Sequence, residues 1–201
     1  MRLLVATTNR DKLREIRTLL PSIDLATLSD LPAVAEPEET GTTFADNARL
    51  KARYYAAHAG LLTVAEDSGL SIDALDGEPG VQSARYLRPD ASYQERFDAI
   101  FERLAAQPDR PRTARFVCAL AVAEGDAILY ETTGIVEGEI TTAPAGRGGF
   151  GYDPIFHYPP YAATLAEVSP EAKLAVAHRG QAFRTLAAWI DAHRATGRPT
   201  R

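Results

Sequence analysis

The sequence predicts an α/β fold in which a two-lobed mixed sheet is flanked by helices and the middle of the chain is rich in β-structure. Short apolar runs at residues 3–6 and 62–65 alternate with segments of helical periodicity, a pattern typical of α/β proteins. Residues 113–136 form a long β-prone stretch interrupted by Gly125 and Asp126, which predicts an antiparallel hairpin. At 201 residues, the chain is long enough for one large domain or two small lobes.

The composition is ordinary for a globular protein, with 45% hydrophobic and 24% charged residues. The formal net charge of -5 gives no global basic field, so we expect no binding to long nucleic acid. No apolar run approaches membrane-spanning length, so we expect no membrane partner. Cys118 is the only cysteine and lies in an apolar run, which predicts a core thiol. The chain opens directly on a strand rather than on a signal peptide, which favours a cytoplasmic location.

The first expected strand, Leu3–Ala6, is followed by a polar loop and by a helix that ends near Pro21. A helix N-terminus presents backbone amides and a positive dipole, which favour an anion. The glycines of a Walker loop are missing, so a helix cap with exposed charges is the simpler alternative. The candidate anion-binding residues are Thr7, Thr8, Asn9, Arg10, Asp11 and Lys12.

A second short strand is expected at residues 25–31, and the loop after it carries the acids Glu38 and Glu39. Either acid could join a second carboxylate in holding a hard cation, although solvation in the loop is the simpler interpretation. The sequence leaves open which of the two would serve.

Thr43 predicts the start of the next helix, with Asp46 in the position of a capping-box acid. The helix should run to about His58, because Gly60 follows it. Lys51 lies on a different face from the small apolar residues of this helix. An ordinary surface lysine is the simpler interpretation of Lys51.

The central stretch of the chain begins with the strand expected at residues 62–65, which should stop at Glu66 and Asp67. Acids at the carboxyl end of a buried strand lie where open α/β sheets bind ligands. Successive strand side chains point to opposite faces, so Glu66 and Asp67 should have different roles. Ser68 and Gly69 then allow a sharp turn or a close approach to a ligand.

The second half of the chain adds two glycine-rich or basic candidate segments. Residues 107–111 are polar and proline-rich, and we expect them to be the hinge between the two lobes. Residues 144–153, PAGRGGFGYD, place Phe150 between glycines, where an aromatic ring could stack on a base. Ser169 predicts a helix start, and Lys173 lies in its first turn. A terminal helix follows the pair His178-Arg179.

The polar residues without a simple structural explanation fall into three chemical groups. One suits phosphates, one suits Mg²⁺ held by one or two carboxylates, and one suits a nucleobase. Together they indicate a nucleoside triphosphate. The phosphate group is Thr7, Thr8, Asn9, Lys12, Lys51 and Lys173; the acids are Asp67 with Glu38 or Glu39; the base group is Phe150, Asp153, His178 and Arg179.

Five segments make the chain resemble the non-standard purine nucleoside triphosphate pyrophosphatases, which act on inosine and xanthosine triphosphates. The segments are ATTNRDKLREI, EETGTTFADNARLKA, AEDSGLSIDALDGEPGVQSARY, GGFGYDPIF and EAKLAVAHRGQA. The resemblance spans almost the whole chain, in the order and spacing of the family. It implies that residues 1–201 form a single domain of two lobes with an active-site cleft between them. It also implies a homodimer and Mg²⁺-dependent hydrolysis of ITP, dITP and XTP to the monophosphate and pyrophosphate.

The resemblance also implies roles for individual residues. It assigns the triphosphate to residues 7–12 with Lys51 and Lys173, and the metal and catalytic acid to Asp67, with Glu39 as the second acid. Ser68 would contact substrate and His178-Arg179 would read the purine edge. The base pocket would be Phe150, Gly151, Tyr152 and Asp153, and the catalytic residues would be Asp67, Lys12 and Lys51.

Two positions depart from the family pattern. Thr8 stands where the phosphate loop usually has glycine, and Ala177 stands where serine usually precedes the His-Arg pair. Neither departure removes an acid or a cation. The alternatives are a Maf-like pyrophosphatase for modified pyrimidine nucleotides and a nucleotide-binding regulator without catalysis.

Overall fold

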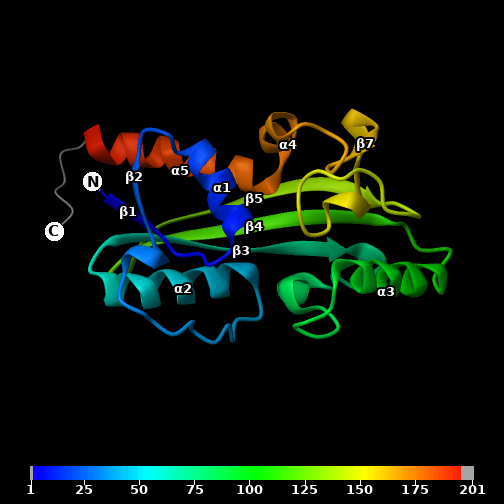
Figure 1. The fold of residues 1–201 in the computed structure, drawn as a ribbon, viewed down its shortest axis with the longest axis horizontal. Helices are drawn as coiled ribbons and strands as arrows, with labels where there is room; N and C mark the ends of the chain where they lie inside the picture. Colours follow the sequence, from blue (N-terminus) through cyan, green and yellow to red (C-terminus); the bar gives the residue numbers. More distant parts are fainter. Residues whose placement is uncertain (1, 196–201) are drawn as a thin grey trace. The chain divides into compact units, whose positions relative to one another are not determined.

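The computed structural model describes residues 2–195, which form a seven-stranded sheet with helices (Figure 1). The strand order is β2-β1-β3-β4-β5-β6-β7. The strands are β1 (Arg2–Val5), β2 (Asp24–Thr27), β3 (Leu62–Ile72), β4 (Thr113–Glu124), β5 (Ala127–Ile140), β6 (Phe156–Tyr158) and β7 (Ala163–Thr164). The helices are α1 (Arg10–Leu19), α2 (Phe44–Ala59), α3 (Tyr93–Ala105), α4 (Pro170–Val176) and α5 (His178–Ala195).

The sheet combines parallel and antiparallel strands. β1 pairs in parallel with β2 and β3, whereas β6 pairs antiparallel with β5 and β7. β4 and β5 are neighbours joined by the two-residue turn Gly125-Asp126, with Gly125 at φ 56°. The prediction of a mixed α/β sheet with a β-rich middle is confirmed, as is the hairpin.

The described residues divide into two compact units that interleave along the chain. The first unit comprises described residues of 1–67, 118–134 and 178–201, and the second comprises 68–117 and 135–177. The boundaries between the two units fall within β3, β4 and β5 and before α5. Each of these three long strands therefore contributes residues to both units. The expected hinge at residues 107–111 is therefore wrong, since this segment lies inside the second unit.

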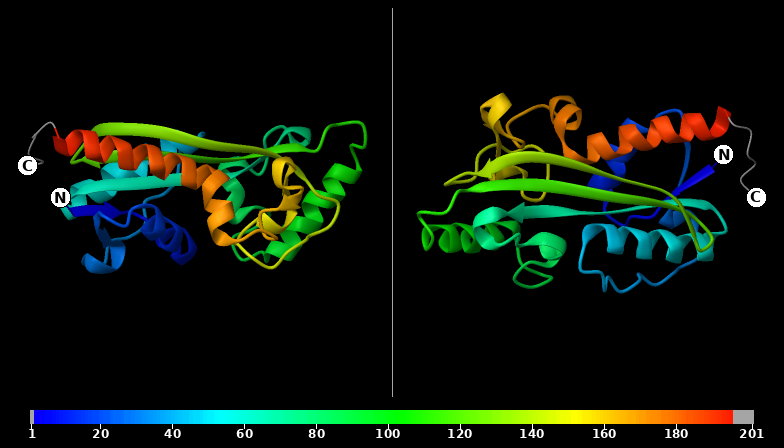
Figure 2. Two further views of the ribbon diagram at one scale, coloured as in Figure 1. Left: turned by 90° about the horizontal axis from the view of Figure 1, so that it is seen from above. Right: turned by 180° about the vertical axis from the view of Figure 1, so that it is seen from behind.

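The first unit has a helical layer on each face of its strands (Figure 1 and the right-hand view of Figure 2). Alternate residues of each strand point to opposite faces, so the apolar side chains divide into two clusters. The cluster on the side of α1 and α5 contains Leu3, Val5, Ile16, Leu20, Leu62, Val64, Cys118, Leu120, Phe183 and Leu186. The cluster on the side of α2 contains Leu4, Ala6, Ala48, Ala52, Tyr55, Ala65, Ala119 and Ala121.

In the second unit, α3 packs against the parts of β3, β4 and β5 that belong to that unit. Ser92 caps α3 in a capping box with Glu95, as its sequence predicts. Tyr152 packs edge-on against Tyr93 and near Phe97, with ring centroids at 5.3 and 6.1 Å. The apolar cluster includes Leu70, Ile72, Phe97, Ile100, Leu104, Phe116, Val136, Tyr152 and Phe156.

Two strand boundaries differ from those expected. β3 continues to Ile72 instead of stopping at Ala65, because Gly69 lets Ser83 approach the strand. A Cβ at Gly69 would lie 2.2 Å from Ser83 Oγ, which accepts a hydrogen bond from Leu70 N–H at 2.9 Å. The second strand stops at Thr27 rather than at residue 31, because Asp30 accepts from Thr27 N–H and closes a turn.

The helix ends follow local signals that the sequence carries. Thr43 Oγ1 accepts from Asp46 N–H, and Gly60 ends α2 in the left-handed conformation at φ 62°. Asp46 departs from a full capping box, because its carboxylate accepts from the Thr43 hydroxyl. Ser169 caps α4 by accepting from Ala172 N–H.

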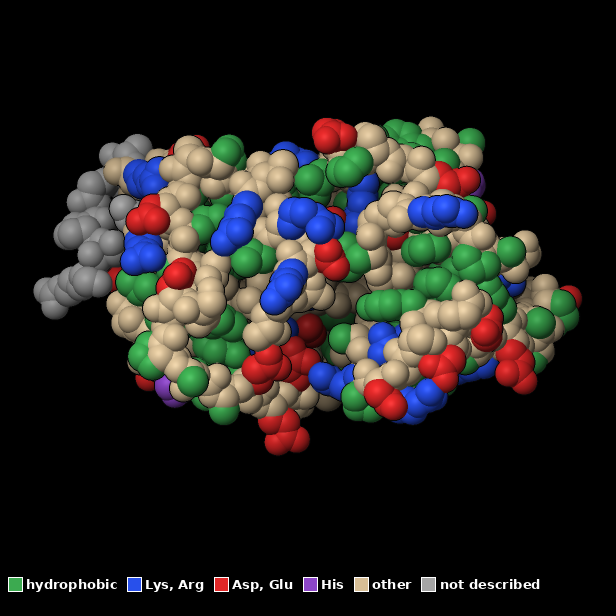
Figure 3. Space-filling model, in the orientation of Figure 1, with side chains coloured by type: hydrophobic (Ala, Val, Ile, Leu, Met, Phe, Trp, Pro, Cys, Tyr) green, Lys and Arg blue, Asp and Glu red, His purple; other side chains and the backbone are tan. Residues whose placement is uncertain are grey.

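No helix among residues 2–195 is long and apolar enough to cross a membrane. On the face drawn in Figure 3, basic side chains are interspersed with acidic ones rather than gathered into one basic surface.

Candidate functional site

Glu66 and Asp67 lie on β3 just beyond the point where its parallel neighbour ends. Val5, the last residue of β1, pairs with Val64, and Ala6 N–H donates to Val64 O at 2.9 Å. The two acids therefore occupy the carboxyl end of the parallel part of the sheet, although β3 itself continues. They point to opposite faces of the strand and are both buried, at 4% and 7% exposure.

Glu66 lies on the α1 and α5 side in a buried network of charges. Its carboxylate accepts two hydrogen bonds from Arg179, from Nε at 2.7 Å and from Nη2 at 3.2 Å. Arg179 Nη1 also donates to Glu15 on α1, at 2.6 Å. Lys12 Nζ lies 3.8 Å from Glu66, and the Cys118 thiol donates to it at 3.1 Å. One carboxylate thus holds two cations and a thiol.

The pKa values of this network follow from burial opposed by charge. Burial alone would raise the pKa of Glu66, but Arg179 and Lys12 hold it well below its usual range. Burial lowers the pKa of Lys12 more than Glu66 raises it. For Cys118, burial and the negative charge of Glu66 both raise the thiol pKa, so the thiol stays protonated and can donate. The buried ionised Glu66 is therefore compensated by its neighbours.

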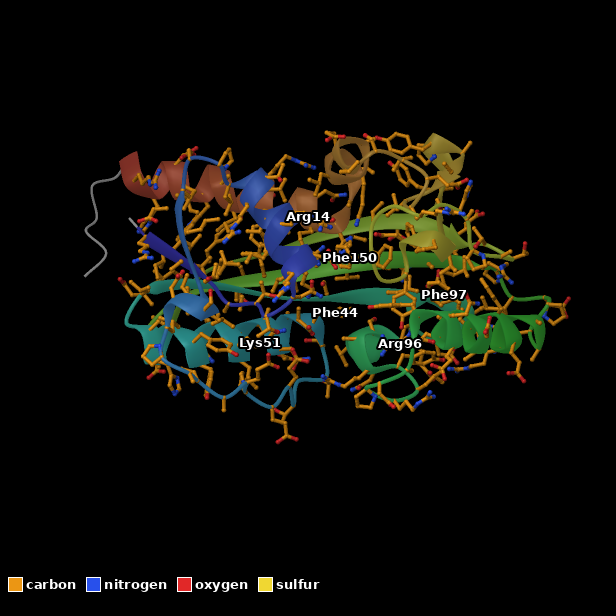
Figure 4. All side chains as sticks on the ribbon, viewed as in Figure 1. Arg14, Phe44, Lys51, Arg96, Phe97 and Phe150 are labelled. Carbon is orange, nitrogen blue, oxygen red and sulfur yellow. The ribbon has the colours of Figure 1, made fainter. Side chains whose placement is uncertain are left out.

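Asp67 lies on the α2 side and is held by two residues of that helix. Lys51 Nζ donates to Asp67 Oδ1 at 3.2 Å and to Glu39 Oε1 at 2.6 Å, and Figure 4 shows Lys51 on α2. Asn47 Nδ2 donates to Asp67 Oδ2 at 3.1 Å. Burial would lower the pKa of Lys51, but Asp67 and Glu39 outweigh it and raise the pKa. Lys51 is therefore a charged, largely buried lysine rather than a surface one.

The two neighbouring acids of the loop before α2 have different surroundings. Glu39 is half-buried against Lys51, whereas the Glu38 side chain is exposed. Lys51 brings the carboxylates of Glu39 and Asp67 to one cation, which is the charge arrangement that a divalent ion also requires. Two carboxylates suffice for Mg²⁺, which completes its octahedron with water and phosphate oxygens. Among the described residues, no group of three or more His, Cys, Asp or Glu side chains forms a metal cage.

The loop between β1 and α1 is stabilised by its own side chains. Asn9 Oδ1 accepts from the backbone N–H groups of Asp11 and Lys12, at 2.9 and 3.0 Å, and Thr7 Oγ1 accepts from Asn9 N–H. Asn9 thus acts as the N-cap of α1, so these two amides are already satisfied within the chain. Thr8 in this loop and Arg10, the first residue of α1, are both exposed. The charge of Lys12 and the exposed end of the loop remain suited to an anion.

The His178-Arg179 pair forms the first turn of α5 rather than a loop before it. Gly134 on β5 permits this placement, because a Cβ there would lie 2.0 Å from the backbone oxygen of His178 and 2.9 Å from Ala182 N. His178 and Arg179 are both buried. Ala177, immediately before them, is the buried C-cap of α4.

A second cluster of predicted site residues lies within the second unit. Lys173 Nζ donates to Asp153 Oδ2 at 2.6 Å, with both side chains almost fully buried. The same ammonium lies 4.4 Å from the centre of the Phe150 ring. Phe150 N–H donates to Asp153 Oδ2 at 2.8 Å. Lys173 therefore lies with the residues expected to bind a base, although the sequence groups it with the phosphate residues.

The glycines around Phe150 give the loop its shape. Gly149 and Gly151 have φ of 66° and 68°, and a Cβ at Gly149 would lie 2.1 Å from Asp153 Oδ2. Tyr152 is buried and donates through its hydroxyl to Ser83 O at 2.9 Å, so it supports the loop from the core side. Ser68, the other residue expected to contact substrate, lies on β3 at the start of the second unit and is half-buried.

Arg96 supports the segment before α3 in the same unit. It is 3% exposed and donates to the backbone oxygens of Tyr86, Arg88 and Pro89. Figure 4 labels Arg96 and Phe97 on α3.

Three residues that contact Glu66, Asp67 or their partners were not predicted as site residues from the sequence, namely Glu15, Asn47 and Cys118. Glu15 follows Lys12 by three positions beside the apolar Ile16, which places an acid next to the buried side of α1. Asn47 precedes Lys51 by four positions, which places it on the same helix face. Cys118 was expected in the core but not beside Glu66. The helical spacing of Glu15 and Asn47 was the available signal, whereas nothing in the sequence relates Cys118 to Glu66.

The model of the Ham1 family matches residues 3–189. The chain belongs to the Ham1 family. This member is 48% identical over 185 residues to a dITP/XTP pyrophosphatase from a Nostoc species, covering 92% of this chain and 91% of that protein. Its structure is similar to that of a HAM1 protein from Coxiella burnetii, with a TM-score of 0.86, 40% identity and coverage of 95% and 98%. The Ham1 protein of Staphylococcus aureus is similar with a TM-score of 0.87, 34% identity and coverage of 96% and 100%. The resemblance inferred from the five sequence segments is thereby confirmed, and so is the fold class.

Proposed function

We propose that this Ham1 family member hydrolyses non-standard purine nucleoside triphosphates, namely dITP, XTP and ITP, to the monophosphate and pyrophosphate. The observation that carries the proposal is the cluster of Asp67, Lys51 and Glu39, which gathers two carboxylates and a lysine beside α2. A relative 48% identical over most of the chain is named a dITP/XTP pyrophosphatase. This name favours purine substrates over the modified pyrimidines of the Maf-like alternative.

We propose Mg²⁺ as the cofactor, with Glu39 and Asp67 as its protein ligands. Their carboxylates already lie at one cation, the Lys51 ammonium, and hard oxygen ligands are those that Mg²⁺ prefers. When bound, the metal would neutralise phosphate charge and so favour departure of pyrophosphate. Asp67 has two compatible roles: it either binds the metal or takes a proton from the attacking water.

The lysines supply the positive charge that the triphosphate requires. Lys12 and Lys51 lie on opposite faces of β3, each beside one of the two strand acids. Thr8, Asn9 and Arg10 add exposed residues just after the end of β1. We assign these groups to phosphate binding, where they orient the triphosphate and stabilise the charge of the leaving pyrophosphate.

The cluster of the second unit suits a purine ring. The Phe150 ring offers a stacking surface, and Lys173 with Asp153 provides charged groups beside it. The resemblance of the sequence implied that His178 and Arg179 read the purine edge. Arg179 donates to Glu66 and Glu15, so its guanidinium is oriented by these carboxylates. Arg179 is 2% exposed, and these two ion pairs are contacts that the structure gives its guanidinium.

We also propose that the protein acts as a homodimer in the cytoplasm. The resemblance of its five segments to the pyrophosphatase family supports the dimer, and the nucleotide pool that such an enzyme would cleanse supports the location. Sedimentation equilibrium of the purified chain tests the dimer, with the monomer mass of 21.8 kDa as the outcome that would contradict it.

The proposed reaction is tested by incubating the protein with dITP and Mg²⁺ and resolving the products by ³¹P NMR. We expect dIMP and pyrophosphate as the primary products. Formation of dIDP and orthophosphate would place the cleavage at the other anhydride bond and contradict the proposal. Parallel assays with ATP and a modified UTP test the substrate class. Absence of turnover with every nucleotide would favour the regulator alternative.

A further inference from the structure

Asn47 is a fully buried polar residue of α2, and both the oxygen and the nitrogen of its carboxamide form hydrogen bonds. Its Oδ1 accepts from Gly41 N–H at 2.8 Å, and its Nδ2 donates to Asp67 Oδ2 at 3.1 Å. A backbone N–H can only donate, and a carboxylate accepts, so the two partners together determine which way the amide faces. Asn47 therefore connects the backbone before α2 to the acid on β3.

The neighbouring Lys51 makes a second connection between the same two segments. Asn47 and Lys51 are one helical turn apart, and they hold the two oxygens of Asp67 separately, Oδ2 and Oδ1. Lys51 also binds Glu39, and Asn47 also binds Gly41 two residues later. The orientation of Asp67 and the course of residues 39–41 are thus set by one face of α2.

Gly41 makes the close approach to Asn47 possible. A Cβ at this position would lie 2.6 Å from Asn47 Oδ1 and 2.7 Å from the Cβ of Asp46. Any larger residue would push the carboxamide of Asn47 away from its present position. The positions of Gly41 and Asn47 therefore depend on each other. A substitution of either residue should change the hydrogen bond from Asn47 to Asp67.

We propose that Asn47 is a positioning residue of the active site, which holds the carboxylate of Asp67 in the orientation that binds the divalent cation together with Glu39. This inference rests on the proposed function of the Asp67 cluster. Residues that orient the ligands of a metal in this way usually contribute 10- to 100-fold to metal affinity or activity. Asn47 does not touch the reacting atoms and acts through Asp67.

The test compares Asn47→Ala, Asn47→Asp and Gly41→Ala with a control, Thr42→Ala, whose side chain is exposed in the same segment. Each variant is assayed in three ways. Unfolding in urea reports stability, and Mn²⁺ binding is measured by electron paramagnetic resonance without nucleotide. Steady-state hydrolysis of dITP separates kcat from KM.

Asn47→Ala should weaken Mn²⁺ binding by about 10-fold and lower kcat by at least about 10-fold, with little change in KM. Gly41→Ala should change both quantities in the same direction. Asn47→Asp keeps the acceptor for Gly41 but turns a carboxylate toward Asp67. It should therefore lower kcat as Asn47→Ala does, because the donor that orients Asp67 is lost, and a wild-type kcat in this variant would contradict the positioning role.

A purely structural role for Asn47 would give a different pattern. Asn47→Ala would then unfold at lower urea concentration, while the folded protein would retain wild-type Mn²⁺ affinity and kcat, which would overturn the inference. If Asn47→Ala fails to fold, Gly41→Ala decides the question by Mn²⁺ affinity and kcat, and Asn47→Asp decides it by kcat. If the wild-type protein does not hydrolyse dITP, the proposed function fails, whereas the Mn²⁺ measurements still test the connection at Asp67.

Discussion

The adjacent acids Glu66 and Asp67 lie on opposite faces of β3 and have different partners. Glu66 is enclosed by Arg179, Lys12 and Cys118, and its negative charge is matched by cations on the α1 and α5 side. Asp67 has a lysine and an amide on the α2 side, and the lysine is shared with Glu39. The comparison teaches that side-chain alternation along one strand gives adjacent carboxylates separate partners, and the catalytic role proposed above belongs to Asp67 alone. The following predictions, from the largest expected effect to the smallest, test this division.

Replacing Glu66 with glutamine should have the largest effect on stability. The change leaves two buried cations with less compensating charge, and breaking a buried ion pair in this way costs about 3–5 kcal/mol. Urea unfolding of Glu66→Gln beside the wild type measures this loss. A loss below about 1 kcal/mol would mean that the network of Glu66 contributes little to the fold.

Replacing Asp67 with asparagine should lower turnover and leave the protein folded. An amide neither binds a divalent cation well nor takes a proton from water, so we expect kcat for dITP to fall at least about 100-fold. Steady-state assays and urea unfolding of the same preparation separate the two effects. A folded variant with near-native turnover would remove Asp67 from the mechanism.

Substituting Gly134 should displace Arg179 and so disturb the charge network around Glu66. A Cβ would lie 2.0 Å from the backbone oxygen of His178, so Gly134→Ala forces the first turn of α5 and Arg179 to move. Overpacking of this kind costs about 1–3 kcal/mol. The control is Thr133→Ala, whose side chain is exposed on the same strand. Equal stability of the two variants would show that α5 accommodates the extra methyl group.

The smallest effect is expected at Cys118. Its thiol donates to Glu66, and because a thiol is a weak donor we expect this hydrogen bond to contribute only about 1 kcal/mol. Cys118→Ser retains a donor and should keep more stability than Cys118→Ala, as measured by urea unfolding. If Cys118→Ala is the more stable variant, the thiol contributes by packing and not through Glu66.

The sequence by itself determined much of the local structure, because the relevant signals lie within a few residues. The caps at Thr43, Ser92 and Ser169 begin α2, α3 and α4 as expected, and the turn at Gly125-Asp126 joins β4 to β5. Alternation along a strand also predicted that Glu66 and Asp67 have different surroundings. Capping, turn formation and strand periodicity are short-range effects, so a single sequence reveals them.

The tertiary structure decided how distant segments meet. The approach of Ser83 to Gly69 lets β3 run on past its acids, and the interleaving of the two units excludes a hinge at residues 107–111. The contacts of Glu66 with Arg179 span 113 positions in sequence, and those of Asn47 with Asp67 span 20. Such pairings depend on where whole strands and helices pack, which no local pattern of residue types encodes.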